Sequence, residues 1–222
     1  MMFYQELLSA THSEREQFLR TPFLIDGVAG RLRLDSYVAF LTQAYYHVRQ
    51  TVPLFMACGG RLPSRLDWMR GAVAEYIDEE QGHDEWILSD IRACGENQEA
   101  VRHGRPNIAT EVLIAYAYDT VYRRNPIGLF GMVLVLEGTS VNLATRAANA
   151  LAVSLELPPQ AFSYLLSHGS LDEEHIEFYR NLMNRVTEPH DQESIVHCAR
   201  VVYRLYGDMF RSLPHQPVAA AA

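Results

Sequence analysis

Apolar residues recur at helical spacing along most of the chain, whereas alternating β-branched segments bounded by turn dipeptides are missing. This pattern predicts an all-α fold, a single compact bundle of about seven helices. The predicted helices cover residues 3–19 as a short pair, then 35–58, 63–93, 108–124, 126–155, an interrupted segment over 158–186, and 191–213. No linker or repeat divides the chain, so we expect one domain over residues 1–213 and a disordered tail over 214–222.

Residues that start, bend or stop helices support these boundaries. Asp35, Asn107 and Asp191 are each expected to cap the helix that follows. Pro53 is expected to bend the helix over 35–58, and Gly169-Ser170 to interrupt the segment over 158–186. The helix over 126–155 is the most apolar, which predicts a central position with neighbours on most sides.

Charge and composition remove several classes of function. The formal net charge is −8 and the sequence shows no basic stripe, so nucleic acid is not expected as a partner. All nineteen basic residues are Arg, and the absence of Lys excludes Schiff-base chemistry, a covalent pyridoxal phosphate site and a Walker-type phosphate lysine. The longest apolar run, residues 127–136, is about half a membrane span, and no signal peptide is recognisable at residues 1–20. These features predict a cytoplasmic protein without membrane contact.

The three cysteines, Cys58, Cys94 and Cys198, are too few and too far apart for a disulfide framework or a Cys-rich zinc site. They are typical of buried small hydrophobic residues in a reducing compartment.

The predicted helix over 63–93 carries Glu80 and His83, three residues apart. On a helix this spacing places both side chains on one face, as in the Glu-x-x-His pairs of carboxylate-bridged dimetal proteins. A solvated acidic face is the alternative interpretation.

A second group consists of His168, Asp172 and His175, at spacings of four and three. On a continuous helix these positions form one stripe of three potential ligands. The alternative is a polar helix start with exposed histidines, because a break at Gly169-Ser170 would separate His168 from the other two.

A third element is Glu137, which follows the apolar stretch 131–136. Burial of a carboxylate there is unfavourable unless the group is paired, protonated or bound to a metal. The partner is either a single cation such as Arg146 or Arg49, or a metal ion held between this helix and the two ligand groups.

Together these candidates are three carboxylates and three imidazoles. Nitrogen and oxygen ligands without sulfur suit Fe or Mn, and less specifically Zn. Six ligands are too many for one catalytic ion with open positions, so two ions that share bridging carboxylates fit better. Such a centre favours activation of O₂ over simple hydrolysis.

At this point the sequence resembles a known family. Residues 45–54, 78–88, Leu136-Glu137-Gly138 and the stripe from His168 to His175 are similar to motifs of the haem-oxygenase-like fold. TenA thiaminases, the pyrroloquinoline-quinone synthase and non-haem diiron oxidases share that fold, and the resemblance covers residues 37–210. It implies that Glu80, His83, Glu137, His168, Asp172 and His175 bind two iron ions.

The resemblance also implies an activity: O₂-dependent oxidation of a small carboxylic substrate by decarboxylation, desaturation or N-oxygenation, in a homodimer. A TenA-type enzyme would need a nucleophilic Cys, and the quinone synthase works without metal. Where the oxidases sometimes carry an additional carboxylate on an early helix, this sequence has Gln43, Tyr45, Tyr46 and His47.

Several further residues are candidates for contact with the ligands or the substrate. They are His47, Tyr45, Met132, Arg49 and Arg146, of which the two arginines would pair with a substrate carboxylate. The alternatives are a metal-free module that binds a small molecule, a cofactor-independent enzyme of the TenA or quinone-synthase type, and a hydrolase with one metal ion.

Overall fold

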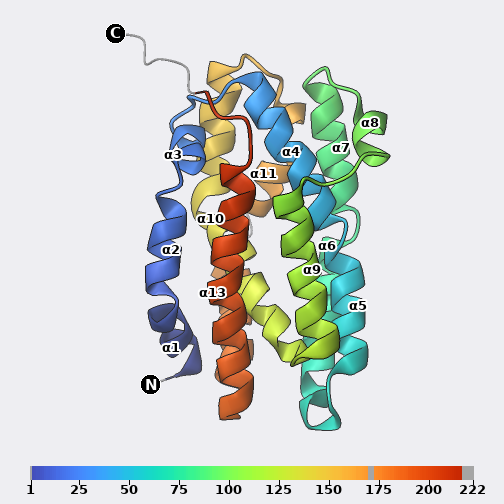
Figure 1. Cartoon of the computed structure of the whole chain (residues 1–222), viewed down its shortest axis with the longest axis vertical. Helices are drawn as coiled ribbons and strands as arrows, with labels where there is room; N and C mark the ends of the chain where they lie inside the picture. Colours follow the sequence, from blue (N-terminus) through green and yellow to red (C-terminus); the bar gives the residue numbers. More distant parts are fainter. Residues whose placement is uncertain (1, 170–172, 217–222) are drawn as a thin grey trace.

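The computed structural model describes residues 2–169 and 173–216, and every regular element in this part of the chain is helical (Figure 1). The α-helices are Phe3–Ala10 (α1), His12–Leu19 (α2), Pro22–Val28 (α3), Leu34–Val48 (α4), Thr51–Arg61 (α5), Arg70–Glu80 (α6), His83–Ala93 (α7), Gln98–Arg102 (α8), Ile108–Arg123 (α9), Leu129–Ser154 (α10), Ser163–Gly169 (α11), Glu173–Asn184 (α12) and Pro189–Arg211 (α13). Three short 3-10 helices are Ser64–Met69 (η1), Pro126–Gly128 (η2) and Pro159–Ala161 (η3). The all-α prediction is confirmed, but the described residues form thirteen α-helical segments rather than about seven.

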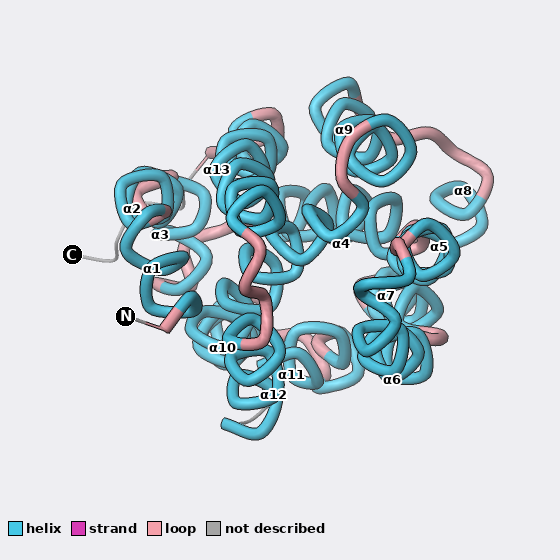
Figure 2. The backbone as a smooth tube through the Cα atoms, turned by 90° about the horizontal axis from the view of Figure 1, so that it is seen from below, coloured by secondary structure: helices cyan, strands magenta, loops and turns pink. Residues whose placement is uncertain are grey.

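Helix α10 is the central element of the bundle, as its apolar sequence predicts. It packs against α13, α11, α3 and α9, and Phe130 and Val135 on it are fully buried. Viewed along the bundle, α4, α5, α6, α10 and α13 surround the middle of the molecule, and α1 to α3 form an outer group beside α10 and α13 (Figure 2). Glu80 at the end of α6 and Glu137 on α10 line one cavity in this interior.

Two predicted long helices are each divided. The helix expected over 35–58 ends at Val48 and resumes at Thr51, so the break lies at Arg49-Gln50 and not at Pro53. Pro53 belongs to the first turn of α5, where a missing backbone N–H is tolerated. The helix expected over 63–93 is divided between α6 and α7 at Gly82, whose φ of 91° lies in the left-handed region that favours glycine.

The predicted caps have different outcomes. Asn107 caps α9 as expected, with its side chain accepting the Thr110 N–H at 2.9 Å. Asp35 instead lies in the first turn of α4, which begins at Leu34. Asp191 is also inside its helix.

The Asp191 side chain makes a tertiary contact in place of the predicted cap. Its buried carboxylate accepts hydrogen bonds from Arg65 at 3.0 Å and from Asn125 at 2.7 Å. The interaction therefore joins α13 to η1 and to the start of η2.

The position of α11 depends on one buried carboxylate of α7. Asp90 accepts the backbone N–H of Ser163 at 3.1 Å and of Tyr164 at 2.9 Å, and the Ser163 hydroxyl also donates to it. These N–H groups begin α11 and have no partner inside the helix. Asp90 thereby fixes the end of α11 from which Tyr164 enters the interior.

Part of the predicted tail is packed on the bundle. His215 Nε2 lies 2.8 Å from Asp26 Oδ2, and its ring contacts Phe23. Residues 217–222 lie outside the described residues. Within the described ranges no single helix is long and apolar enough to cross a membrane; one bent pair, Pro126–Val141 with Leu143–Ser154, meets the length and composition criteria, and it is part of the central helix.

The close approach of α10 and α13 generates a stability prediction. A Cβ added at Gly131 would lie 2.6 Å from Ala199 N and 3.0 Å from Cys198 Cβ, and it would also meet the backbone of Ile195. Gly131→Ala is therefore expected to lower the free energy of unfolding by roughly 1–3 kcal/mol, because two backbones must separate. Thermal and urea denaturation would measure the change.

The matched control is Gly60→Ala on α5, where an added Cβ meets nothing within 4 Å. This exposed helical glycine gains up to about 1 kcal/mol on substitution by alanine. Equal effects of the two substitutions would contradict the close helix contact.

Candidate metal centre

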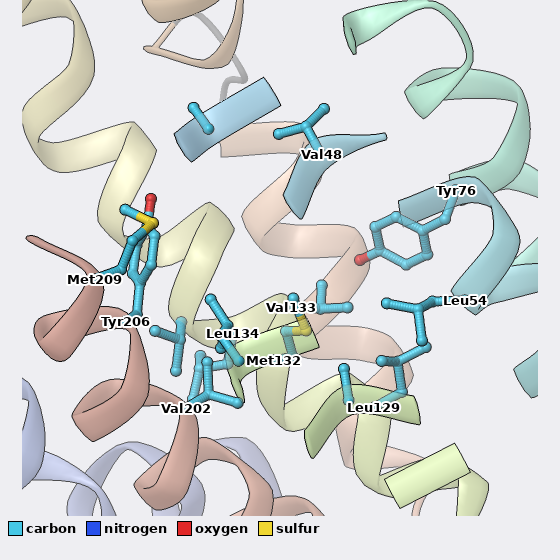
Figure 3. Packing of buried hydrophobic residues seen from close by; sticks show 14 of the residues in the cluster. Val48, Leu54, Tyr76, Leu129, Met132, Val133, Leu134, Val202, Tyr206 and Met209 are labelled. Atoms are coloured by element: carbon cyan, nitrogen blue, oxygen red, sulfur yellow. The ribbon is translucent and has the colours of Figure 1, made fainter. Parts of the chain in front are cut away.

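A central cavity of about 610 Å³ lies in the middle of the bundle between α4, α5, α10 and α13. Most of its wall is apolar, and two carboxylates, Glu80 from α6 and Glu137 from α10, reach it. The remaining lining residues are His47, Val48, Thr51, Leu54, Phe55, Leu129, Met132, Val133, Leu136, Ser140, Tyr164 and Tyr206. Figure 3 shows part of this packing, including Val48, Leu54, Leu129, Met132 and Val133.

Glu80 and His83 lie together, but across a helix break and not along one helical face. Glu80 is the last residue of α6 and His83 the first of α7, and Glu80 Oε2 lies 3.1 Å from His83 Nδ1. Both side chains are largely buried, and the His83 ring stacks on Trp86 at 4.3 Å. The turn at Gly82 therefore holds a carboxylate and an imidazole at the edge of the interior.

His175 on α12 approaches a carboxylate that sequence reasoning did not select. Its Nε2 lies 3.5 Å from Glu79 Oε1, one residue before the predicted ligand Glu80. Burial and the neighbouring Glu75 and Glu80 carboxylates raise the pKa of Glu79, against the opposing effect of His175. The run of three acids at 78–80 was the available signal, but the spacing alone did not show that two of them face histidines.

Glu137 is a carboxylate without a hydrogen bond or ion pair among the described residues. Burial, followed by the charges of Glu80 and Glu79, raises the pKa of Glu137 well above its ordinary value. Glu137 is half-buried, and it lines the central cavity and also an N-terminal cavity of about 850 Å³ between α1, α2, α10, α12 and α13. Arg49 and Arg146 are exposed, and among the described residues neither forms an ion pair or hydrogen bond with Glu137.

The second predicted ligand group is only partly described. Helix α11 ends at Gly169 and α12 begins at Glu173, while the side chain of His168 and all of Asp172 lie outside the described residues. Among the residues that are described, no group of three or more His, Cys, Asp or Glu side chains is close enough to hold a metal ion. The described ligands are thus two pairs and the isolated Glu137.

The side chains around Glu137 nevertheless fit a metal ion. All the donors are carboxylate or imidazole groups, which suit Fe or Mn. Tyr76, on α6, is buried, and its hydroxyl has no hydrogen-bond partner among the described residues. Burial raises the pKa of Tyr76 far above its ordinary value, and the carboxylates of Glu137 and Glu79 add to the effect. The donor types therefore fit a metal ion, and the Tyr76 hydroxyl is a buried polar atom that the described residues leave without a hydrogen bond.

Of the residues predicted to contact substrate or ligands, His47 and Met132 line the central cavity. The His47 ring is buried and meets Tyr206 edge-on at 5.6 Å. Tyr45 is buried beneath the Arg49 guanidinium, 5.4 Å from its ring centre. Arg49 and Arg146 are themselves exposed and line neither the central nor the N-terminal cavity.

Sequence reasoning missed Tyr164 and Tyr206, which connect the central cavity to a second space. An apolar cavity of about 620 Å³ between α3, α4, α10, α11 and α13 shares Ser140, Tyr164 and Tyr206 with the central cavity. The two cavities therefore form adjoining compartments along α10.

The cysteines do not offer a nucleophile to this interior. All three are buried, as predicted, and none lines the central cavity. Burial is the main cause that raises the pKa of each thiol to about 12, so the thiols are protonated at neutral pH. This arrangement disfavours TenA-type nucleophilic chemistry.

Comparison with solved structures shows the fold. A domain of unknown function with a haem oxygenase-like fold from Shewanella denitrificans OS217 superposes with a TM-score of 0.82 at 23% identity, covering 94% of this chain and 90% of that one. A TenA homologue from Pseudomonas syringae pv. tomato DC3000 gives 0.79 at 12% identity, with coverages of 94% and 91%. Haem oxygenase from Leptospira interrogans gives 0.71 at 15% identity, with coverages of 96% and 100%.

These low identities establish the fold alone, and no curated protein matches the sequence. The model of a family described as iron-containing redox enzyme matches residues 38–207, which is most of the chain. The chain therefore belongs to the iron-containing redox enzyme family and has its haem oxygenase-like, all-α fold.

Proposed function

We propose that this protein is a non-haem oxidase that uses two iron ions and O₂ to oxidise a small carboxylic substrate. The proposed ligands are Glu80, His83, Glu137, His168, Asp172 and His175, and Mn is the alternative metal. Glu79 joins them as a carboxylate that contacts His175. The family assignment supports iron and redox chemistry, and the number of ions and the reaction are our proposal.

The observation that carries the proposal is the isolation of Glu137. A carboxylate enclosed by protein, with Glu80 and Glu79 as charged neighbours and no cation paired with it among the described residues, is unfavourable in its ionised form. A cation held at Glu137 would replace repulsion by attraction, because the charges of Glu137, Glu80 and Glu79 would each favour it.

Two ferrous ions held by these side chains would supply the electrons that reduce O₂ and the oxidising power that acts on the substrate. The protein's own contribution is the enclosure. The wall formed by Met132, Val133 and Leu136 excludes water from the carboxylates, and the adjoining apolar cavity gives an apolar substrate portion a place to lie.

The lining of the two adjoining cavities also constrains how a substrate carboxylate is held. Among the described residues no Arg lines the central or the apolar cavity, and the sequence has no Lys. A carboxylate in this space therefore has no guanidinium to bind, contrary to the role expected for Arg49 and Arg146. We infer that the bound cations beside Glu80 and Glu137 supply the positive charge that attracts it.

The first prediction concerns iron content. Wild-type protein reconstituted anaerobically with Fe(II) is expected to hold about two irons per chain, and Glu137→Gln clearly fewer, because the amide is a weak ligand that carries no charge. Plasma mass spectrometry after desalting measures the ratio. Glu111→Gln, an exposed position on α9, is the matched control and should retain the wild-type content.

Absence of iron from both wild type and control after reconstitution would refute this proposal. The metal-free binding module would then be the better interpretation, supported by the apolar cavity of about 620 Å³.

The second prediction concerns oxygen. The Fe(II)-loaded protein is expected to consume O₂ and to oxidise its iron, with a change in visible absorbance, whereas the metal-free protein should do neither. An oxygen electrode and stopped-flow absorbance would follow both events. Turnover of a carboxylic ester or amide under anaerobic conditions, with no O₂ uptake, would instead indicate a hydrolase.

A further inference from the structure

The hydroxyl of Tyr76 makes no hydrogen bond that stabilises the fold among the described residues. Its side chain is only 1% exposed, yet its hydroxyl has no hydrogen-bond partner among the described residues. A phenylalanine would fill the same volume without leaving a buried donor unpaired. Buried polar groups without partners are rare in native proteins, so the hydroxyl calls for an explanation.

The ring is held so that the hydroxyl has a defined direction. Phe55 stacks on it with centroids 5.0 Å apart and planes within 6°, and Phe130 and Phe178 pack on it at 6.1 and 5.7 Å. Figure 3 shows the Tyr76 ring extending inward from α6, with its oxygen toward the middle of the bundle near Val133. The oxygen is thus directed into the interior and away from solvent.

The acceptors in its neighbourhood are the candidate ligands. Tyr76 precedes Glu79 and Glu80 by three and four residues, which places all three on one side of α6. Among its charged neighbours the Glu137 carboxylate has the largest effect in raising the pKa of Tyr76. The ring packs on Phe130 of α10, and its oxygen is directed toward Val133, one helical turn before Glu137. No hydrogen bond joins Tyr76 and Glu137 in this structure.

We propose that Tyr76 is a positioning residue of the metal centre, whose hydroxyl donates a hydrogen bond to the Glu137 carboxylate when metal is bound. This inference rests on the proposed function, since it requires a cation at Glu137. Burial raises the pKa of Tyr76, so the phenol keeps its proton at neutral pH and would act as a donor to a carboxylate oxygen of Glu137. Such contacts orient a ligand and strengthen its hold on the ion.

The test compares Tyr76→Phe with Tyr37→Phe. Tyr37 is a buried tyrosine whose hydroxyl donates to Ala161 O at 2.7 Å, away from the candidate ligands, so it is a matched control. For wild type and each variant, two quantities would be measured: the Kd for Fe(II) under anaerobic conditions, by competition with a chromophoric chelator, and the Tm of the metal-free protein.

Tyr76→Phe is expected to change the Kd for Fe(II), and Tyr37→Phe the Tm of the metal-free protein. Tyr76→Phe should leave the Tm of the metal-free protein unchanged or higher, because it removes an unpaired buried group, and should weaken Fe(II) binding about 10- to 100-fold. Tyr37→Phe should lower that Tm, because it leaves a buried carbonyl without its donor, and should leave the Kd for Fe(II) unchanged. The Co(II)-loaded proteins add a spectroscopic test, since the visible bands should shift only in Tyr76→Phe.

The outcomes separate this inference from the proposed function. Tight Fe(II) binding by wild type that Tyr76→Phe does not weaken would overturn the role of Tyr76 and leave the metal centre intact. A Tm loss in Tyr76→Phe as large as in Tyr37→Phe, with an unchanged Kd, would also overturn it and show a purely structural hydroxyl. Wild-type protein that takes up no iron would overturn both proposals.

Discussion

The position of the Glu137 carboxylate on the most apolar helix, in the bundle interior, is the constraint on which the rest of the site depends. Transfer of an ion from water to a protein interior is unfavourable by several kcal/mol even after relaxation. Three arrangements relieve that penalty: protonation, an ion pair or a bound cation. His12 and Arg15 line the N-terminal cavity together with Glu137, but among the described residues no basic side chain forms an ion pair or hydrogen bond with it. The Glu137 carboxyl is therefore left without a paired positive charge in this part of the chain.

The breaks in the helices matter as much as the helices. The chain turns at Gly82, whose backbone is left-handed, so α6 ends at Glu80 and α7 begins at His83. The two side chains therefore meet across a turn and not along one helix. Asp90, two turns further along α7, fixes the start of α11 by accepting its backbone N–H groups. A single helix α7 therefore connects a candidate ligand to the segment that brings Tyr164 into the cavity. Loss of either turn or cap would change the interior without removing a ligand.

The sequence was sufficient for what depends on local chemistry. The apolar stretch before Glu137 predicted the central helix, and Asn107 predicted its cap, because each depends on neighbours within a few residues. The break at Arg49-Gln50 was not predictable in this way, since neither residue is a helix breaker and the change of direction follows from packing of α4 and α5 on the bundle. The sequence likewise placed Asp191 as a cap, whereas Arg65, distant along the chain, draws it into a buried ion pair.

The residues of the candidate site divide along the same line. Residue type and spacing predicted Glu80, His83 and His175 as ligands, and this stays a prediction. They could not show that His175 contacts Glu79 and not Glu80, because adjacent acids at a helix end differ only in the neighbours they meet. The sequence alone could not single out Tyr76 at all.

An aromatic residue in an acidic helix is ordinary. Tyr76 became a candidate because its buried hydroxyl has no hydrogen-bond partner among the described residues and points into the interior, and both facts require the positions of its neighbours. The guanidinium groups expected to bind a substrate carboxylate lie at the surface, and the adjoining cavities contain none. The same deficit of positive charge therefore faces both the protein's own carboxylates and any carboxylate that enters. A cation bound at Glu137 would supply positive charge both to the protein's own carboxylates and to a substrate carboxylate. This is the strongest physical reason to place a metal centre there.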